Sequence, residues 1–303
     1  MNIRHVTDLF DEAKRSGRTW VLSVAAPYEP DVLDAIRLAS EGGFVKAILF
    51  GNEERIRAAA QQAALPLGSA IELVPSENDR ETVRAATDCV QEGRAQILVK
   101  GLVPTSALFR AVLSKEFGLR SDRLLSHVAV FNCPMTGRLM FLTDAGINIA
   151  PNVHRKVQIV RNAVDVARRL GVEQPRVALL AAVDTLNYPA MQATLDAALV
   201  SRIARSGVVP NAIIEGPFAL DNAVSELAAK KKKRGGRVAG HADILCAPEI
   251  ETANVLYKAL QSFCGSTLAG AVVGARSPIA VPSRADTAES KLMSIALACL
   301  LAD

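Results

Sequence analysis

The chain has 303 residues, half of them apolar and only 4% aromatic. This composition excludes a disordered chain and is typical of an α/β protein whose parallel strands are buried on both faces. Its 35 basic and 31 acidic residues give a formal net charge of +4, which argues against a dedicated nucleic-acid-binding protein.

The cysteines indicate a reducing compartment. Cys89, Cys133, Cys246, Cys264 and Cys299 lie far apart with no C-x-x-C pair, so neither a disulfide framework nor a zinc site is predicted. The four histidines are scattered without metal-ligand spacing. The first 17 residues form a polar amphipathic pattern without the apolar core of a signal peptide, and no apolar run is long enough to span a bilayer. We expect a soluble cytoplasmic protein without a bound metal.

Strands and helices alternate from the start of the chain. Strands are predicted at 19–26, 44–51, 69–75 and 95–101, with helices at 29–43, 52–64 and 79–93 between them. Such alternation predicts right-handed crossovers and a mostly parallel sheet.

The middle of the chain begins differently. The strand-like runs 124–134 and 138–146 are separated by only three residues, "MTG", which predicts an antiparallel hairpin. Later strands are predicted at 176–182, 211–217, 242–248 and 268–275, and later helices at 153–171, 189–207, 221–233, 249–263 and 292–302. Two α/β lobes with a cleft between them form the simplest architecture for this order.

Familiar nucleotide-binding signatures are missing: the chain has neither a P-loop motif nor a strand-coupled G-x-G-x-x-G. A candidate anion site follows the strand at 95–101, where Gly101 precedes Thr105, Ser106 and Arg110. Free backbone N–H groups at such a helix start attract anions. An ordinary helix cap beside a solvated arginine is the alternative, and local sequence leaves both open.

The segment "VPSRADTAESK" (281–291) also has two interpretations. Asp286 and Glu289, three residues apart, fit a capping box at the start of the last helix. Arg284 is also able to clamp a phosphoryl group, and Ser283 to donate to a substrate oxygen.

The basic run "KKKKRGGR" (230–237) follows a predicted helix end, where cations complement the helix dipole. A solvated loop is the simpler interpretation, and attraction of a polyanionic ligand is the alternative.

Seven segments, taken in order, are recognisable: "FGNEERI", "LVKGLVPTSALFRAVL", "LLSHVAVF", "FLTDAGINIAPN", "EGPFALDNAVS", "GHADILCAPEIETANVLYKAL" and "VVGARSPIAVPSRADTAESKLMSIALA". Through them the sequence resembles the phosphate acetyltransferase/phosphate butyryltransferase family over essentially the whole chain, from the Gly-Asn after the second predicted strand to the last helix. Their order and spacing make the match specific. "VKGLV", "LLSHVAVF" and "SRADTAESKL" are more similar to the butyryl branch than to the acetyl branch.

The resemblance implies the reaction acyl-CoA + phosphate = acyl phosphate + CoA, with CoA as substrate and no permanently bound cofactor or metal. It also implies two three-layer α/β/α lobes of the isocitrate/isopropylmalate-dehydrogenase-like type with the active site in the cleft between them. We expect the first lobe at 1–118 plus 277–303, the second at 119–276, and a homodimer or higher homo-oligomer.

Residue roles follow from the same resemblance. Ser283 and Arg284 match a Ser-Arg pair that contacts the reacting acyl and phosphate groups, and Arg110 matches a substrate-binding arginine. The family's proposed base is an Asp where this chain has Ser290, so Glu289 and Asp286 become the candidate bases. Further substrate-binding candidates are Thr105, Ser106, Asn254, Tyr257 and Lys258, while Ala253 replaces a glycine of the family pattern.

Two other functions remain open at this stage. A metal-dependent dehydrogenase or decarboxylase on the same fold would need clustered ligands, and the sequence shows no such cluster. A non-catalytic CoA-binding or assembly subunit would explain the departures at Ser290 and Ala253.

Overall fold

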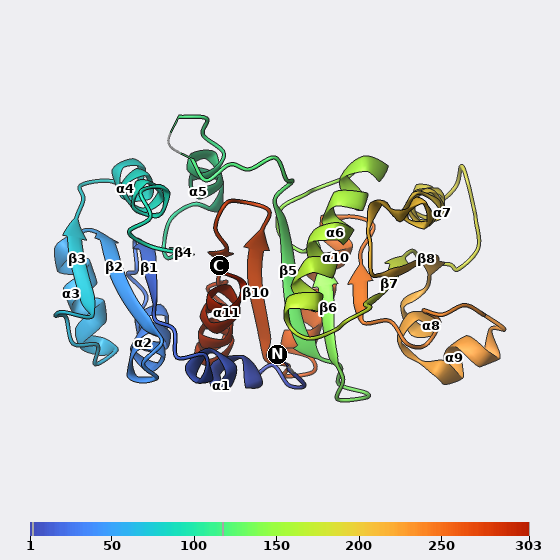
Figure 1. Ribbon diagram of the computed structural model, residues 1–303, viewed down its shortest axis with the longest axis horizontal. Helices are drawn as coiled ribbons and strands as arrows, with labels where there is room; N and C mark the ends of the chain where they lie inside the picture. The colour runs from blue at the N-terminus through green and yellow to red at the C-terminus, as the bar shows by residue number, and fades with distance from the viewer. Residues whose placement is uncertain (2, 117, 303) are drawn as a thin grey trace. The chain divides into compact units, whose positions relative to one another are not determined.

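The computed structural model describes Met1, residues 3–116 and residues 118–302. Contacts divide the chain into two compact units (Figure 1). The first unit contains Val6–Arg123 and Thr267–Asp303, and the second contains Met1–His5 and Leu124–Ser266. This division differs from the predicted one in residues 1–5, 119–123 and 267–276.

The first unit is a sheet with helices on both faces. Its strands are β1 (Trp20–Ala25), β2 (Val45–Gly51), β3 (Ile71–Pro75), β4 (Ile97–Lys100), β10 (Leu268–Val273) and β11 (Ile279–Ala280), and its helices are α1 (Asp8–Arg15), α2 (Pro30–Glu41), α3 (Glu53–Gln62), α4 (Asp79–Gln91), α5 (Thr105–Val112) and α11 (Ala288–Leu301). The strand order is β3-β2-β1-β4-β11-β10, parallel except for β10 against β11.

Helix positions in this unit follow from the crossovers. The chain moves outward from β1 to β3 and then returns to β4, so right-handed connections put α4 on the face opposite to α2 and α3. α4 packs on β1 and β2, while α2 packs on α11. α11 is buried from Ser290 to Leu301, as its almost uninterrupted apolar sequence requires.

The second unit contains a mixed sheet of order β5-β6-β9-β7-β8. Its strands are β5 (Ser126–Asn132), β6 (Leu139–Thr143), β7 (Arg176–Leu180), β8 (Ile213–Phe218) and β9 (Ile244–Cys246), and its helices are α6 (Val153–Arg169), α7 (Gln192–Ile203), α8 (Leu220–Val224), α9 (Glu226–Lys231) and α10 (Ile250–Ser262), with a short π-helical turn at Ala204–Val208. β5 and β6 form the predicted antiparallel hairpin, and β6, β9, β7 and β8 are parallel neighbours.

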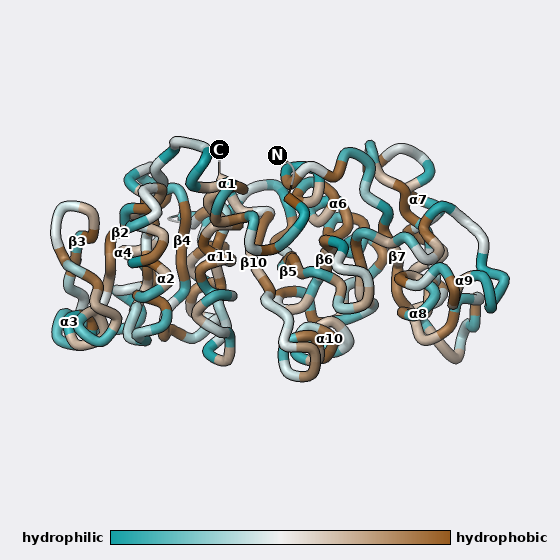
Figure 2. The backbone as a smooth tube through the Cα atoms, turned by 90° about the horizontal axis from the view of Figure 1, so that it is seen from below, coloured by the Kyte–Doolittle hydropathy of each residue, from teal (hydrophilic) through white to brown (hydrophobic). Residues whose placement is uncertain are grey.

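The cores of both units follow the apolar runs of the sequence. Strand residues such as Leu22, Leu98 and Val177 have no exposed surface. In Figure 2 hydrophobic colour runs along β4, β7 and α11, whereas α3 is mostly hydrophilic. The predicted α/β fold class is confirmed. No helix in the described part of the chain is long and apolar enough to cross a membrane.

The elements differ from prediction in three places. β11 was not predicted, because a strand of two residues is specified by pairing with β4 and β10 rather than by its own pattern. The helix predicted at 221–233 is divided into α8 and α9 at Ser225, which has an extended backbone. The Ser225 side chain accepts a hydrogen bond from Ala228 N and so caps the start of α9. The helix predicted at 189–207 is shorter, as α7 ends at Ile203.

Candidate active site

Three loops of the first unit meet at one edge of its sheet. β1 and β4 are parallel neighbours with Ala25 opposite Lys100, and β4 and β11 are parallel neighbours with Val99 opposite Ala280. The loops after these strands therefore emerge at the same, carboxyl, edge. The strand order reverses between β1 and β4, which is where open α/β sheets bind ligands.

Gly101 begins the loop after β4. Its N–H donates to Ala25 O at 2.9 Å, and Leu102 N donates to Ala26 O at 2.7 Å. A Cβ at Gly101 would collide with the backbone of Ala25 and Ala26, so this crossing requires glycine. The glycine brings the β1 and β4 loops into direct contact.

α5 carries three of the predicted residues. Its N-cap residue is Pro104, which has no capping side chain, so neither Thr105 nor Ser106 caps the helix. Thr105, Ser106 and Arg110 are exposed. The side-chain cap of the second interpretation is therefore wrong, whereas the exposed Arg110 agrees with that interpretation.

The loop after β11 is held in shape by Asp286. Its Oδ2 accepts from Ser283 N at 2.7 Å, and its own N–H donates to Ser283 O at 3.0 Å. Asp286 is 5% exposed, whereas Arg284 at the loop tip is exposed. The paired contacts fix the backbone that carries Ser283 and Arg284.

The predicted capping box at Asp286 and Glu289 is wrong. Thr287 is the N-cap of α11, and its Oγ1 accepts from Ser290 N at 3.1 Å. Asp286 instead bonds Ser283, and the exposed Glu289 accepts from Thr267 Oγ1 at 2.8 Å. Asp286–Glu289 and Thr287–Ser290 have the same spacing, so either pair could form the helix cap. Because Asp286 is hydrogen-bonded to Ser283 in the preceding loop, Thr287 caps the helix.

Ser290, at the position of the family's proposed base, is a structural residue. Its hydroxyl accepts from Leu268 N at 3.2 Å, and the residue is 1% exposed. It thereby satisfies the first backbone N–H of β10. A carboxylate would be buried at this position, which is costly without a paired cation.

Lys100, the last residue of β4, was not singled out by the sequence analysis. It is 9% exposed, and its ammonium donates to Gly101 O at 3.2 Å. Burial lowers the pKa of Lys100, the positive charge of Arg284 lowers it further, and Glu29 opposes the shift. The available signal was a charged residue ending the buried strand "ILVK". Lys100 and Arg284 thus place two positive charges at this edge.

A second lysine ties the neighbouring helices together. Lys291, in the first turn of α11, donates to Asp31 Oδ2 at 3.1 Å, and its side chain is only 2% exposed. Asp31 lies in the first turn of α2. This ion pair fastens the start of α11, and hence the end of the Ser283 loop, to α2.

The other predicted residues lie on α10 of the second unit. Asn254 Nδ2 donates to Ala145 O at 3.2 Å. The Tyr257 ring meets that of His127 edge-on at 6.0 Å between centroids. Lys258 Nζ lies 5.1 Å from the centroid of the Tyr257 ring and donates to Gln261 Oε1 at 3.0 Å. These contacts order α10 within its own unit.

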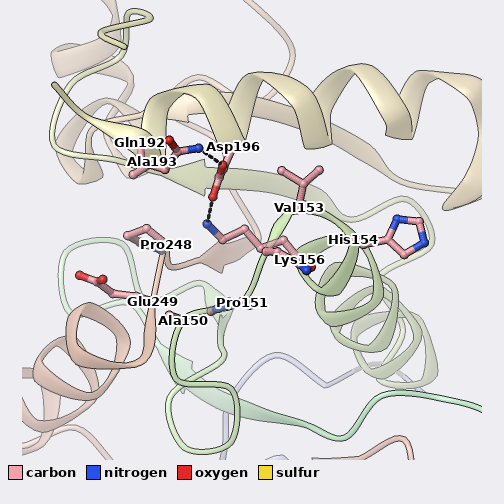
Figure 3. A pocket seen from close by; sticks show the side chains of 11 residues that line it. Ala150, Pro151, Val153, His154, Lys156, Gln192, Ala193, Asp196, Pro248 and Glu249 are labelled. Carbon is pink, nitrogen blue, oxygen red and sulfur yellow. Dashed lines mark hydrogen bonds and ion pairs between the residues drawn. The ribbon is translucent and has the colours of Figure 1, made fainter. Parts of the chain in front are cut away.

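A cavity of about 690 Å³ in the second unit contains a buried ion pair (Figure 3). Lys156 Nζ lies 2.6 Å from Asp196 Oδ2, and Gln192 Nε2 donates to Asp196 Oδ1 at 2.7 Å. The cavity's one lysine is therefore neutralised within the protein. An adjoining apolar cavity of about 730 Å³ is lined by Leu180, Met191, Leu220, Val255 and Leu256, among others.

Several side chains of the basic run (230–237) are paired with neighbouring residues of the same unit. Lys232 Nζ lies 2.8 Å from Asp221, and Lys230 Nζ lies 3.6 Å from Glu226. The Arg234 guanidinium stacks 4.5 Å from the centroid of the Phe218 ring. These contacts favour the solvated-loop interpretation over a site for a polyanion.

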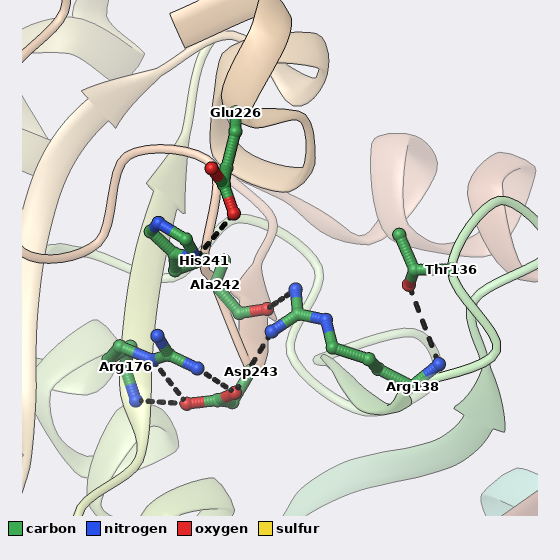
Figure 4. Close-up of polar contacts among 7 residues, drawn as sticks. All are labelled: Thr136, Arg138, Arg176, Glu226, His241, Ala242 and Asp243. Atoms are coloured by element: carbon green, nitrogen blue, oxygen red, sulfur yellow. Dashed lines mark hydrogen bonds and ion pairs between the residues drawn. The ribbon is translucent and has the colours of Figure 1, made fainter.

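A polar network beside this run is structural as well (Figure 4). Arg176 Nη2 lies 3.0 Å from Asp243 Oδ1, and Arg138 Nη1 lies 3.8 Å from the same oxygen. Hydrogen bonding to Asp243 raises the pKa of Arg176, although burial opposes the shift. His241 Nδ1 lies 3.5 Å from Glu226 Oε1. Within the described residues, no cluster of three His, Cys, Asp or Glu side chains is arranged to hold a metal.

Comparison with known proteins identifies the family. A family model described as "Phosphate acetyl/butaryl transferase" matches residues 68–299. A probable phosphate butyryltransferase of Bacillus subtilis (strain 168) is 44% identical over 277 residues, covering 91% of each chain. A phosphate acetyltransferase of Thermotoga maritima is 36% identical over 302 residues, covering 97% of this chain and 98% of the relative.

A solved structure agrees with these sequence matches. A branched-chain phosphotransacylase from Enterococcus faecalis V583 superposes with a TM-score of 0.82 at 32% identity, covering 94% of this chain and 100% of that one. The predicted resemblance is confirmed over nearly the whole sequence: the chain belongs to the phosphate acetyl/butyryl transferase family.

Proposed function

We propose that this protein is a phosphate butyryltransferase-like enzyme that moves a short-chain acyl group between CoA and inorganic phosphate. The observation that carries the proposal is the Ser283–Arg284 loop. Asp286 fixes this loop at the carboxyl edge of the first unit's sheet, in a chain 44% identical to a probable phosphate butyryltransferase. Acyl transfer needs this combination of a hydroxyl donor and a cation on rigid backbone.

The reaction proceeds by addition and elimination at the thioester carbonyl. A phosphate oxygen attacks the carbonyl carbon, and the oxyanion of the tetrahedral intermediate accepts a hydrogen bond from Ser283. Collapse of the intermediate breaks the C–S bond and releases CoA as a thiolate, which takes up the proton that the attacking hydrogen phosphate loses on becoming acyl phosphate. Arg284 and Arg110 hold the phosphate with charge-assisted hydrogen bonds, and Thr105 and Ser106 contribute hydroxyl and backbone donors.

The reverse reaction needs a base. A CoA thiol has an ordinary pKa of about 8.5 and is mostly protonated at neutral pH, so the base must remove its proton as sulfur attacks acyl phosphate. Asp286 is buried and already bonded to Ser283 N, whereas Glu289 is exposed and bonded only at Oε2. We assign the base to Glu289 and a positioning role to Asp286.

The butyryl branch is favoured over the acetyl branch by similarity. Identity is 44% to the probable phosphate butyryltransferase and 36% to the phosphate acetyltransferase. The substrates are CoA, a short-chain acyl group and phosphate, without a permanently bound cofactor. The roles of Asn254, Tyr257 and Lys258 in substrate binding stay predictions.

We also propose that the enzyme is a cytoplasmic homo-oligomer. The five cysteines are free, which fits a reducing compartment. Val255, 68% exposed, and Leu220, 42% exposed, border the apolar cavity of the second unit. Exposed apolar surface of this kind is typical of subunit contacts. Multi-angle light scattering tests this point, and a monomer at all concentrations would contradict it.

The test of the function is phosphate-dependent release of CoA from acetyl-, propionyl- and butyryl-CoA, followed with a thiol reagent in the presence of EDTA. Cys264 is the exposed cysteine, so a Cys264→Ser background removes the protein's own accessible thiol. We expect release that requires phosphate, survives EDTA and is fastest with butyryl-CoA. Fastest release from acetyl-CoA would assign the acetyl branch, and no release from any chain would overturn the proposal.

A further inference from the structure

We propose that Lys100 binds the inorganic phosphate together with Arg284, which adds a buried cation to the phosphate site at the strand-order reversal of the first unit. The inference rests on the proposed function, because it assigns a further residue to the same reaction. It adds a phosphate ligand that neither the sequence motifs nor the Ser283 loop supply.

The buried lysines differ in how the protein treats their charge. Three lysines of the described chain are buried: Lys100, Lys156 and Lys291. Lys156 pairs with Asp196 at 2.6 Å and Lys291 with Asp31 at 3.1 Å. Within the described residues Lys100 has no carboxylate within ion-pair distance and donates only to the carbonyl of Gly101. Among the buried lysines of the described residues, it is the one without an ion-pair partner.

The charges around Lys100 also favour a bound anion. A buried ammonium is unfavourable without a counter-ion, and Arg284 adds a second positive charge from the loop after β11. Glu29, in the loop after β1, offsets this only in part, since the pKa of Lys100 remains lowered. An anion between Lys100 and Arg284 would remove the repulsion and satisfy the ammonium's remaining donors.

Lys100 also lies where a ligand is expected in this type of sheet. Lys100 ends the strand next to the order reversal, with Ala25 of β1 as its register partner. The β11 loop that carries Arg284 begins beside it, because Ala280 pairs with the preceding residue, Val99. Ligands in open α/β sheets bind at this place. Phosphate is the substrate whose charge and size fit a pair of cations.

The experiment measures phosphate binding directly by isothermal titration calorimetry with the full chain and without CoA. Lys100→Met removes the charge and keeps an unbranched side chain. We expect its phosphate Kd to rise roughly 10- to 100-fold, the loss of one charge-assisted hydrogen bond. In steady-state assays the KM for phosphate should rise similarly, while the KM for acyl-CoA stays within about twofold.

The matched control is Lys46→Met. Lys46 is an exposed lysine near the amino end of β2, so its removal changes the net charge equally but at the opposite edge of the same sheet. Its phosphate Kd should equal that of the wild type. Lys100→Arg, which keeps a cation, should restore part of the affinity. If Lys100→Met does not fold, Lys100→Gln replaces it, and the same loss of affinity is expected.

An unchanged phosphate Kd in the Lys100 variant, or an equal loss in Lys46→Met, would overturn this inference. The outcomes separate it from the proposed function. A wild type that releases CoA, with normal phosphate binding in Lys100→Met, refutes only the role of Lys100. A wild type whose phosphate binding depends on Lys100 but that releases no CoA refutes the acyl transfer and leaves the phosphate site standing.

Discussion

The two units each contain a buried lysine beside a potential ligand site, and they treat its charge differently. In the second unit Lys156 meets Asp196 at 2.6 Å, and Gln192 satisfies the other carboxylate oxygen (Figure 3). In the first unit the Lys100 ammonium donates to the carbonyl of Gly101, and burial and the positive charge of Arg284 together outweigh the opposing charge of Glu29 and lower its pKa. A neutralised charge stabilises its own unit, whereas an unneutralised one is left for a ligand. Variants that separate stability from activity test that difference.

The largest effect is expected on stability, from Lys156→Met. This change leaves Asp196 buried without its cation and should lower the free energy of unfolding by about 3–5 kcal/mol. Urea denaturation measures the change. The double variant Lys156→Met/Asp196→Leu should recover most of it, and the KM for phosphate should stay normal while the protein is folded. A large rise in the KM for phosphate with unchanged stability would contradict the assignment of Lys156 to stability rather than to phosphate binding.

The next effect is on turnover, from Ser283→Ala. Removing one donor to an oxyanion lowers kcat by roughly 100- to 1000-fold. The midpoint of urea unfolding should shift little, because the bond that shapes the loop is made by the backbone N–H of Ser283 and not by its hydroxyl. Steady-state kinetics with saturating butyryl-CoA and phosphate measures the loss. A kcat within twofold of the wild type would remove Ser283 from the reaction.

Glu289→Gln tests the assignment of the base. A positioned base contributes at least about 100-fold, so thiol attack on acyl phosphate should slow by about that factor. The side chain is exposed, and its bond to Thr267 can be kept by the glutamine oxygen, so stability should change by less than about 0.5 kcal/mol. Asp286→Asn is the matched control, with nearly normal turnover expected. If Asp286→Asn slowed the reaction more than Glu289→Gln, the base would be Asp286 instead of Glu289.

Asp286→Ala tests whether Asp286 positions the Ser283 loop. It removes the acceptor of Ser283 N and should lower the free energy of unfolding by about 1.5–3 kcal/mol. The kcat should fall by about tenfold, because the loop no longer fixes Ser283. Rescue of both values in Asp286→Asn would identify a positioning residue, since an amide oxygen still accepts this bond. Loss of activity in the amide variant without loss of stability would contradict the assignment.

Sequence patterns predicted the parts of this fold that are local. The run "TWVLSVAA" and the hairpin around "MTG" form strands where their apolar patterns place them. β11 is different, because two residues become a strand only by pairing with residues about 180 positions earlier in β4 and seven to nine positions earlier in β10. The sequence "PIAV" by itself does not indicate that it pairs with β4 and β10.

The site shows the same limit. Family resemblance marked Ser283 and Arg284, but the four letters "ILVK" do not say whether the ammonium of Lys100 meets a carboxylate or another cation. That depends on Glu29 and Arg284, which lie in loops distant in sequence. The cap of α11 was mispredicted for a related reason: Asp286–Glu289 and Thr287–Ser290 have equal spacing, and a contact outside the helix selects the second pair.

The smallest predicted effect is the pH dependence of phosphate binding, and it tests the charge of Lys100 directly. Phosphate binds the ammonium form, and burial and Arg284 hold the pKa of Lys100 below its ordinary value despite the opposing charge of Glu29. As pH rises through that lowered pKa the cation is lost, so the KM for phosphate should increase, by about twofold at the pH that equals the pKa. In Lys100→Arg the guanidinium stays charged over the same range, and the alkaline rise should disappear. A rise of the same size in both proteins would mean that a group other than Lys100 titrates. The charge of Lys100 would then have no role in phosphate binding, and the two buried lysines would not differ in function.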